Sequence, residues 1–101
     1  MEEFFRQRLV QLRSQKQVSA RDMSLSLGQS ESYINKIENG KSLPSMQVFF
    51  YICDYFDISP KEFFDSDSHY PVAVHKLTDD LKMLTDSQIS IITDLVKELI
   101  Q

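Results

Sequence analysis

The chain has 101 residues and a hydrophobic content of 42%, which is enough for one compact domain with or without a short appendage and argues against disorder. No apolar run approaches the roughly 18 residues of a membrane span, and the opening residues MEEFFRQR lack the basic start and cleavage site of a secretion signal. One cysteine excludes an internal disulfide, so we expect a cytoplasmic protein with no membrane partner.

The formal net charge of −4 argues against nucleic-acid binding, because contacts with phosphates need cations. The charge is uneven, however. Residues 1–44 carry seven cations and five anions, whereas residues 45–101 carry four cations and ten anions. A mildly basic first part and an acidic second part suit a protein that presents one end to DNA.

The N-terminal part of the chain predicts two helices. Apolar residues recur at helical spacing over residues 3–15 and place Phe5, Leu9 and Leu12 on one face. Ser19, with Asp22 three residues later, is the expected N-cap of the second helix.

Residues 19–40 are expected to form two short helices joined by a tight turn. Gly28 lies between them and supplies the left-handed conformation that the turn needs, and the small Ser24 lets the two helices cross closely. The second helix of this pair, the third of the chain, is expected to begin after Ser30 as its N-cap and to end near Glu38.

The third helix is expected to bury Ile34 and Ile37 and to turn polar residues outward. The outward residues are Glu31, Ser32, Asn35 and Lys36, with Tyr33 near the edge. Ser, Asn and Lys are residue types that contact base edges and phosphates, so the two helices indicate a helix-turn-helix with its second helix in a DNA major groove. Without the surrounding motif, the same polar face would be ordinary solvated surface.

Two further helices are expected before residue 65. The first follows its N-cap Ser45, and its buried side is expected to contain Met46, Phe49, Phe50, Cys53 and Phe56. We interpret Cys53 as a small core residue rather than a reactive thiol. The sequence SPKE at residues 59–62 combines an N-cap, a proline at the first helical position and a glutamate at the third, which predicts a short fifth helix carrying Phe63 and Phe64.

Residues 66–77 contain Pro71 and show no helical period, so we interpret them as a linker after a first domain of residues 1–65. His69 and His75 lie in this segment without a cysteine or carboxylate at ligand spacing. No metal site and no cofactor are therefore expected.

Residues 78–101 are expected to form a C-terminal helical segment, with a capping box from Thr85 to Gln88. Its apolar residues are Ile89, Ile92, Leu95, Val96 and Leu99, and Ile91 and Ile100 widen the same face. This face is broader than one small neighbour would cover, so we predict that it forms a homodimer interface. The helix could instead fold back and complete the core of its own domain, or use one edge for each purpose.

These motifs together resemble the lambda-repressor/Cro-like helix-turn-helix family, also called the XRE family of transcriptional regulators. The resemblance covers residues 5–64 and rests on MSLSLGQS, YINKIENGK, the following PS and FDISPKEFF. It implies an all-α fold, a five-helix lambda-repressor-like DNA-binding domain with a C-terminal helical extension.

The resemblance implies that helix 30–38 enters the major groove and that the loop from Asn39 to Ser42 lies against phosphates. The implied DNA-binding residues are Arg21, Gln29, Ser30, Glu31, Ser32, Tyr33, Asn35, Lys36, Asn39, Lys41 and Ser42. Arg21 and Lys41 are expected on phosphates rather than on bases. Arg13 and Glu38 occupy positions that form a partly buried ion pair in resembling proteins.

Three residues depart from the pattern of the family. Ala20 stands where many members carry Gln, which removes a phosphate contact, and Gln29 replaces a usual apolar turn residue. Glu31 places an anion near the start of the third helix. It could accept from a cytosine amino group or act electrostatically at the helix start, and we favour the second role.

The resemblance implies sequence-specific binding of double-stranded DNA and hence transcriptional regulation, most simply repression by a homodimer that occupies an operator. The sequence contains no Ser/His/Asp set, phosphate loop or metal-ligand spacing, so no enzymatic activity is expected. An alternative of another class is an antitoxin-like or adaptor module whose C-terminal helix binds a protein partner. A third is that the fold is kept and DNA binding is lost.

Overall fold

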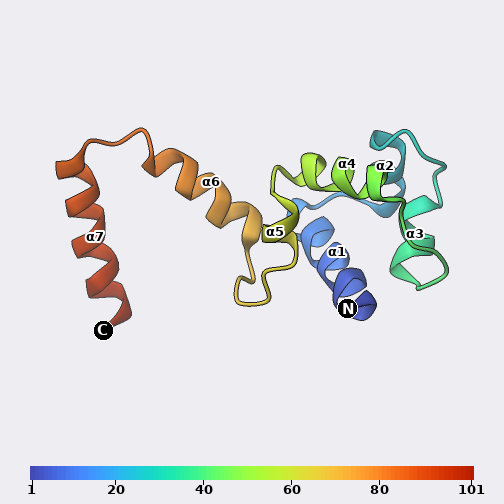
Figure 1. Cartoon of the computed structure of the whole chain (residues 1–101), viewed down its shortest axis with the longest axis horizontal. Coiled ribbons are helices and arrows are strands. Elements are labelled where there is room, and N and C mark those ends of the chain that lie inside the picture. The colour runs from blue at the N-terminus through green and yellow to red at the C-terminus, as the bar shows by residue number, and fades with distance from the viewer.

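The computed structural model describes residues 1–101 and is helical throughout, with no strand (Figure 1). Its seven helices are α1 (Glu2–Lys16), α2 (Ala20–Ser26), α3 (Tyr33–Glu38), α4 (Met46–Phe56), α5 (Pro60–Phe63), α6 (Pro71–Leu81) and α7 (Asp86–Ile100). Helices α1 to α5 lie together, α6 leads away from them, and α7 lies at the far end of a molecule that measures 49 × 25 × 23 Å. The expected all-α fold is confirmed. None of the helices combines the length and apolarity that a membrane crossing requires.

The core lies among the first five helices. Its buried apolar residues are Phe5, Leu9, Leu12, Met23, Ile34, Ile37, Phe49, Ile52, Cys53, Phe56, Ile58 and Phe63. Three aromatic rings from three helices meet inside it. The ring centroid of Phe63 lies 5.2 Å from that of Phe5 and 5.3 Å from that of Phe49, the latter edge to face. These rings join α1, α4 and α5, and burying three aromatic side chains contributes several kcal/mol to the stability of the core.

The buried side of α4 differs from the expected one. Phe49, Cys53 and Phe56 are buried, but Met46 is 68% and Phe50 48% exposed. Ile52 is fully buried instead. The buried stripe follows the spacing i, i+3, i+4, i+7 from Phe49, which leaves Phe50 off the stripe by about 100° and Met46 beyond the edge of the core.

Cys53 is a core residue, as expected, and is 2% exposed. Burial, with a smaller contribution from the neighbouring Asp54, raises the pKa of its thiol to about 11. The thiol therefore stays protonated at neutral pH and is a poor nucleophile.

Most of the expected helix caps are confirmed. Ser19 and Ser45 accept hydrogen bonds from the backbone of the first turns of α2 and α4, and both capping boxes, at Ser59 and at Thr85, are complete. The expected cap at Ser30 is wrong, because α3 begins only at Tyr33 and has no side-chain cap of its own. Residues 29–32 form an irregular turn in its place.

The interpretation of residues 66–77 as a linker is also wrong for their second half, which belongs to α6. Pro71 is the first residue of this helix, a position where its missing N–H removes no hydrogen bond. The apolar residues of α6 show a weak pattern because only the first two are covered: Pro71 is buried and Val72 packs against the core, whereas Val74 and Leu77 are exposed.

An arginine on α1 fastens the segment between α5 and α6. Arg8 is 4% exposed, and its guanidinium donates to the backbone oxygens of Phe63 and Ser68, both at 2.8 Å, and to that of Asp65. The side chain of Gln15 adds a hydrogen bond to the His69 oxygen. The connection is therefore held against α1 although it has no regular structure.

Helix α7 makes no contribution to the core, since none of its residues is buried. Of the expected interface, Leu95, Val96 and Leu99 are between 48% and 74% exposed, whereas Ile89 and Ile92 are half-buried. Ile91 and Ile100 are 67% and 78% exposed. The alternative in which this helix folds back and completes the core of its own domain is therefore wrong.

A histidine in the second turn of α6 lies between two carboxylates. The Nδ1 atom of His75 is 2.9 Å from both carboxylate oxygens of Glu62 on α5, and its Nε2 atom is 3.2 Å from Asp79. The hydrogen bond with Glu62 raises the pKa of His75, and Asp79 and Asp57 add to the rise. Burial acts to raise the pKa of Glu62, but hydrogen bonds from Ser59 and His75 lower it overall.

We expect this contact to make stability depend on pH. The raised pKa of His75 adds stability below its unfolded pKa of about 6.5, and that stability is lost as pH rises through the folded value. The lowered pKa of Glu62 adds stability above about 4.3, lost as pH falls through its folded value. In melting curves, His75→Gln should therefore lower the melting temperature most near pH 5.5 and less at pH 9, relative to the wild type. His69→Gln, which removes no ion pair, should show no such dependence, and equal losses for His75→Gln at both pH values would contradict the assignment.

Candidate nucleic-acid interface

The turn between α2 and α3 depends on Gly28. Its φ is +72°, in the left-handed region that residues with a Cβ rarely adopt. A Cβ at this position would meet no atom within 4 Å, so the backbone conformation and not lack of space requires glycine here.

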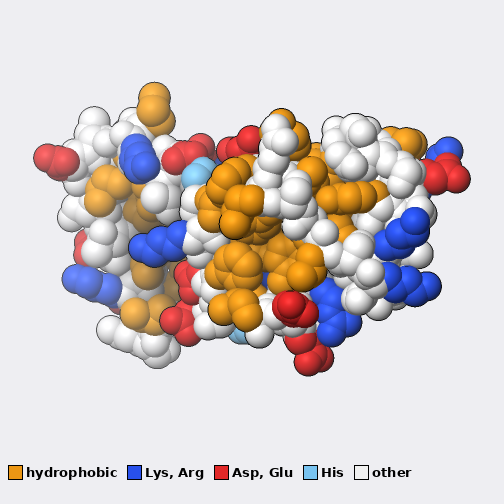
Figure 2. Space-filling view, turned by 45° about the vertical axis from the view of Figure 1, so that its right-hand side comes forward, with side chains coloured by type: hydrophobic (Ala, Val, Ile, Leu, Met, Phe, Trp, Pro, Cys, Tyr) orange, Lys and Arg blue, Asp and Glu red, His pale blue; other side chains and the backbone are white.

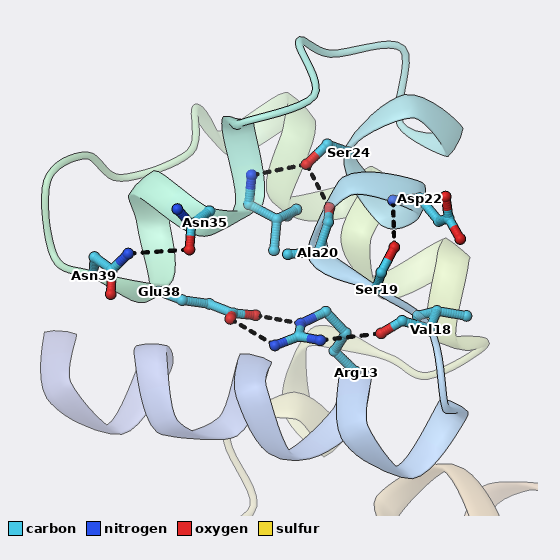
Figure 3. Close-up of polar contacts among 10 residues, drawn as sticks. Arg13, Val18, Ser19, Ala20, Asp22, Ser24, Asn35, Glu38 and Asn39 are labelled. Atoms are coloured by element: carbon cyan, nitrogen blue, oxygen red, sulfur yellow. Dashed lines mark hydrogen bonds and ion pairs between the residues drawn. The ribbon is translucent and has the colours of Figure 1, made fainter.

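Ser24 joins the two helices by hydrogen bonds as well as by its small size. It is fully buried, and its Oγ donates to the Ala20 oxygen at 2.7 Å and accepts from the Ile34 N–H at 3.0 Å (Figure 3). The Ile34 N–H belongs to the first turn of α3, whose donors have no partner within their own helix. Ser24 therefore replaces the missing local cap, which explains why α3 does not need Ser30.

An ion pair holds the other end of α3. Arg13 Nε lies 2.7 Å from Glu38 Oε2 and Arg13 Nη2 lies 2.9 Å from Glu38 Oε1, while Nη1 donates to the Val18 oxygen (Figure 3). The two side chains are 20% and 9% exposed, and their hydrogen bonding raises the pKa of Arg13. Fixing Glu38 to α1 and Ile34 to α2 sets the position of a helix of only six residues.

The residues with an expected role at DNA come from the start of α2, the turn, α3 and the loop after it. The exposed ones are Arg21, Ser30, Glu31, Asn35, Lys36, Asn39, Lys41 and Ser42, and the half-buried ones are Gln29, Ser32 and Tyr33. Lys and Arg side chains gather at this end of the molecule, on the right of Figure 2. The side-chain amide of Asn39 donates to Oδ1 of Asn35 at 3.1 Å, so these two side chains lie side by side (Figure 3).

Two of these residues have roles that the sequence did not predict. Glu31 lies in the turn before α3 and pairs with Arg21 at 3.1 Å, with both side chains about two thirds exposed. Its carboxylate makes no hydrogen bond to the first turn of α3, and it compensates part of the charge of Arg21. Tyr33 packs against the core, and burial raises the pKa of its hydroxyl.

One cation beside this surface was missed. Arg6 on α1 lies against the loop after α3, where a Cβ on Gly40 would be 3.0 Å from its Nη1 atom. No periodicity, cap or motif marks Arg6, because the contact joins residues far apart in the chain. No group of three His, Cys, Asp or Glu side chains in the structure is arranged to hold a metal ion.

We expect the two ion pairs near α3 to differ in strength. Arg13→Met should lower the free energy of unfolding by about 3 kcal/mol, the lower end for breaking a buried pair, because Glu38 stays buried without a partner. Arg21→Met should lower it by less than about 1 kcal/mol, since its pair is exposed to solvent. Urea denaturation of the two variants measures both values. Equal losses would contradict a structural role for the Arg13–Glu38 pair.

Comparison with known proteins agrees with this geometry. A family model described as a helix-turn-helix domain matches residues 7–67, more than half of the chain. Comparisons with curated proteins and with solved structures gave no match. The matched region contains α2, the turn and α3 together with the helices that hold them. The chain therefore belongs to the helix-turn-helix domain family of XRE-like DNA-binding regulators.

Proposed function

We propose that the protein binds double-stranded DNA in a sequence-specific manner, reads the major groove with α3 and acts most simply as a repressor that occupies an operator. The observation that carries this proposal is the way in which α3 is held. Its two ends are tied to α2 and α1, its apolar residues Ile34 and Ile37 are fully buried, and its polar face is exposed. A helix held in this way can enter a groove without rearrangement.

The local charge supports the proposal although the chain is acidic overall. Lys36 on α3 and Lys41 in the next loop are exposed and lie within 4.0 Å of no carboxylate. Unpaired lysines of this kind release counterions from DNA when they contact its phosphates, and this release favours binding. Most of the acidic residues belong to residues 45–101, beyond α3 in the chain.

We propose different roles for these two lysines. Lys36 lies on the exposed side of α3, where a side chain reaches base edges, and a lysine favours the acceptors of guanine. Lys41 lies in the loop after the helix and would contact a phosphate. The neighbouring Asn35 and Asn39 amides offer donors and acceptors to bases and backbone.

We also propose that two copies bind together through α7. A single helix-turn-helix contacts few base pairs, and two copies related by a two-fold axis read two half-sites. Helix α7 carries five apolar residues that are about half or more exposed, which is unusual for a helix in water. The same face supports the second candidate, binding of a protein partner by an antitoxin-like or adaptor chain. The free thiol of Cys53 fits action in the reducing cytoplasm.

Selection of bound sequences from random duplexes at about 50 and 200 mM salt tests the central proposal, because affinity lost at higher salt counts phosphate contacts. Enrichment of one sequence with two related half-sites is expected. Failure to retain any duplex at the lower salt concentration would overturn DNA binding.

Substitution of the two lysines tests their roles on the selected duplex. Lys36→Ala should weaken binding by about 1–3 kcal/mol and relax the preference at one or two base positions. Lys41→Ala should weaken binding to all sequences alike and reduce the salt slope by about one unit. Quantitative binding curves on matched and altered duplexes measure both effects. If neither variant differs from the wild type, the assignment of α3 to the groove is wrong.

A charge on α7 tests the dimer. Val96→Glu should give folded monomers with weakened operator affinity, because Val96 belongs to the exposed apolar face and not to the core. Ser90→Glu adds the same charge at an exposed polar position of α7 and serves as the control. Sedimentation measures the oligomeric state and circular dichroism the helix content. A wild-type monomer at tens of micromolar, with and without DNA, would rule out the dimer and favour a different protein partner.

A further inference from the structure

A small hollow lies between the N-terminal part of α1 and the loop that follows α3. Its volume is about 210 Å³, and its lining residues are Glu2, Arg6, Asn39, Gly40, Ser42 and Leu43. The loop continues directly from α3, so the hollow borders the helix that we propose to enter the major groove.

Glycine at position 40 lets the Arg6 guanidinium lie against the loop. A Cβ on Gly40 would be 3.0 Å from Arg6 Nη1 and 3.5 Å from Arg6 Cζ, and the φ of Gly40 is +75°. No side chain therefore separates the guanidinium from the loop backbone. This packing also restricts Arg6, which is half-buried, so less side-chain entropy is lost when a ligand binds.

The Arg6 guanidinium forms no ion pair within the protein. No carboxylate lies within 4.0 Å of its guanidinium. Glu3 and Glu38 line a neighbouring pocket together with Arg6, and Glu38 uses both of its carboxylate oxygens on Arg13. Glu2 is exposed at the edge of the hollow and is the one acidic residue among its lining residues, so it opposes an anion there.

The loop supplies backbone donors beside this cation. The N–H groups of Gly40 and Lys41 donate to the oxygens of Ile37 and Lys36 and end the helix. The N–H groups of Ser42 and Leu43 donate to no protein acceptor. An arginine fork, together with two backbone donors on residues that line the same hollow, matches the oxygens of a phosphate group.

We propose that this hollow binds a backbone phosphate of the DNA strand that borders the groove entered by α3, with Arg6 as its main ligand. This inference rests on the proposed DNA binding. The site is independent of base sequence, and it adds a contact from α1 to those of the helix-turn-helix. It fixes the register of α3 on the duplex from the side of the loop.

Salt-dependent binding of the full chain to its selected duplex tests the site. Arg6→Gln should weaken binding about tenfold at 50 mM salt for every sequence and reduce the salt slope by about 0.9, the change for one phosphate. Arg6→Lys should keep the slope and lose only part of the affinity, because a lysine keeps the charge without the fork. Lys61→Gln, which removes an exposed cation of α5 outside the hollow, is the matched control and should change neither quantity.

The outcomes separate this site from the proposed function. If the wild type binds no duplex, both proposals fail. If it binds and Arg6→Gln, folded by circular dichroism, keeps the wild-type slope, the phosphate site alone is overturned. A changed base preference in Arg6→Gln would also overturn it. If Arg6→Gln does not fold, a salt slope for Arg6→Lys reduced by one unit would overturn the proposal. The NMR resonance of the Arg6 Nε–H should shift when the duplex is added. A shift with inorganic phosphate and none with the duplex would overturn DNA as the source of the phosphate.

Discussion

The bidentate contact between Arg13 and Glu38 is the interaction on which the arrangement of this molecule depends. Helix α3 has six residues and could not persist alone, since short helices in water are marginal. Glu38 accepts two short hydrogen bonds, and the Val18 oxygen accepts from a further N–H of Arg13. These hydrogen bonds offset most of the free-energy cost of removing the two charges from water. With Ser24 at the opposite end, the pair turns a marginal helix into a fixed one.

Helix α1 extends this principle, because three of its arginines organise three separate segments. Arg13 holds the end of α3, Arg8 holds the connection after α5 through backbone oxygens, and Arg6 lies against the glycine of the loop after α3. Two of these cations are therefore used inside the protein. Counting charges along the chain overstates what α1 offers to DNA, and only Arg6 of the three is free of strong internal partners.

Local features of the structure were predictable from the sequence, whereas most tertiary contacts were not. The serine caps of α2 and α4, both capping boxes and the glycine turn follow from a few neighbouring residues, and the family motifs indicated the Arg13–Glu38 pair. The start of α3 escaped prediction because Ser24, ten residues earlier, replaces a local cap. The start of α6 escaped prediction because the segment before it is held by Arg8, which is 55 to 60 residues away in the chain, and shows no sequence pattern of its own. The contact of Arg6 with the loop at Gly40 was missed for the same reason, because it joins residues far apart in the chain.

In the dimer that we propose, the position of α7 connects DNA reading to assembly. Helix α6 begins at the domain and leads away from it (Figure 1). At its base Val72 packs against the core and His75 contacts Glu62, and its later residues are mostly exposed. It therefore acts as a spacer that carries the apolar face of α7 away from α3. If α7 joins two copies, the distance between their α3 helices depends on this attachment. Half-site spacing would then be determined by contacts at the base of α6, far from any base that α3 reads.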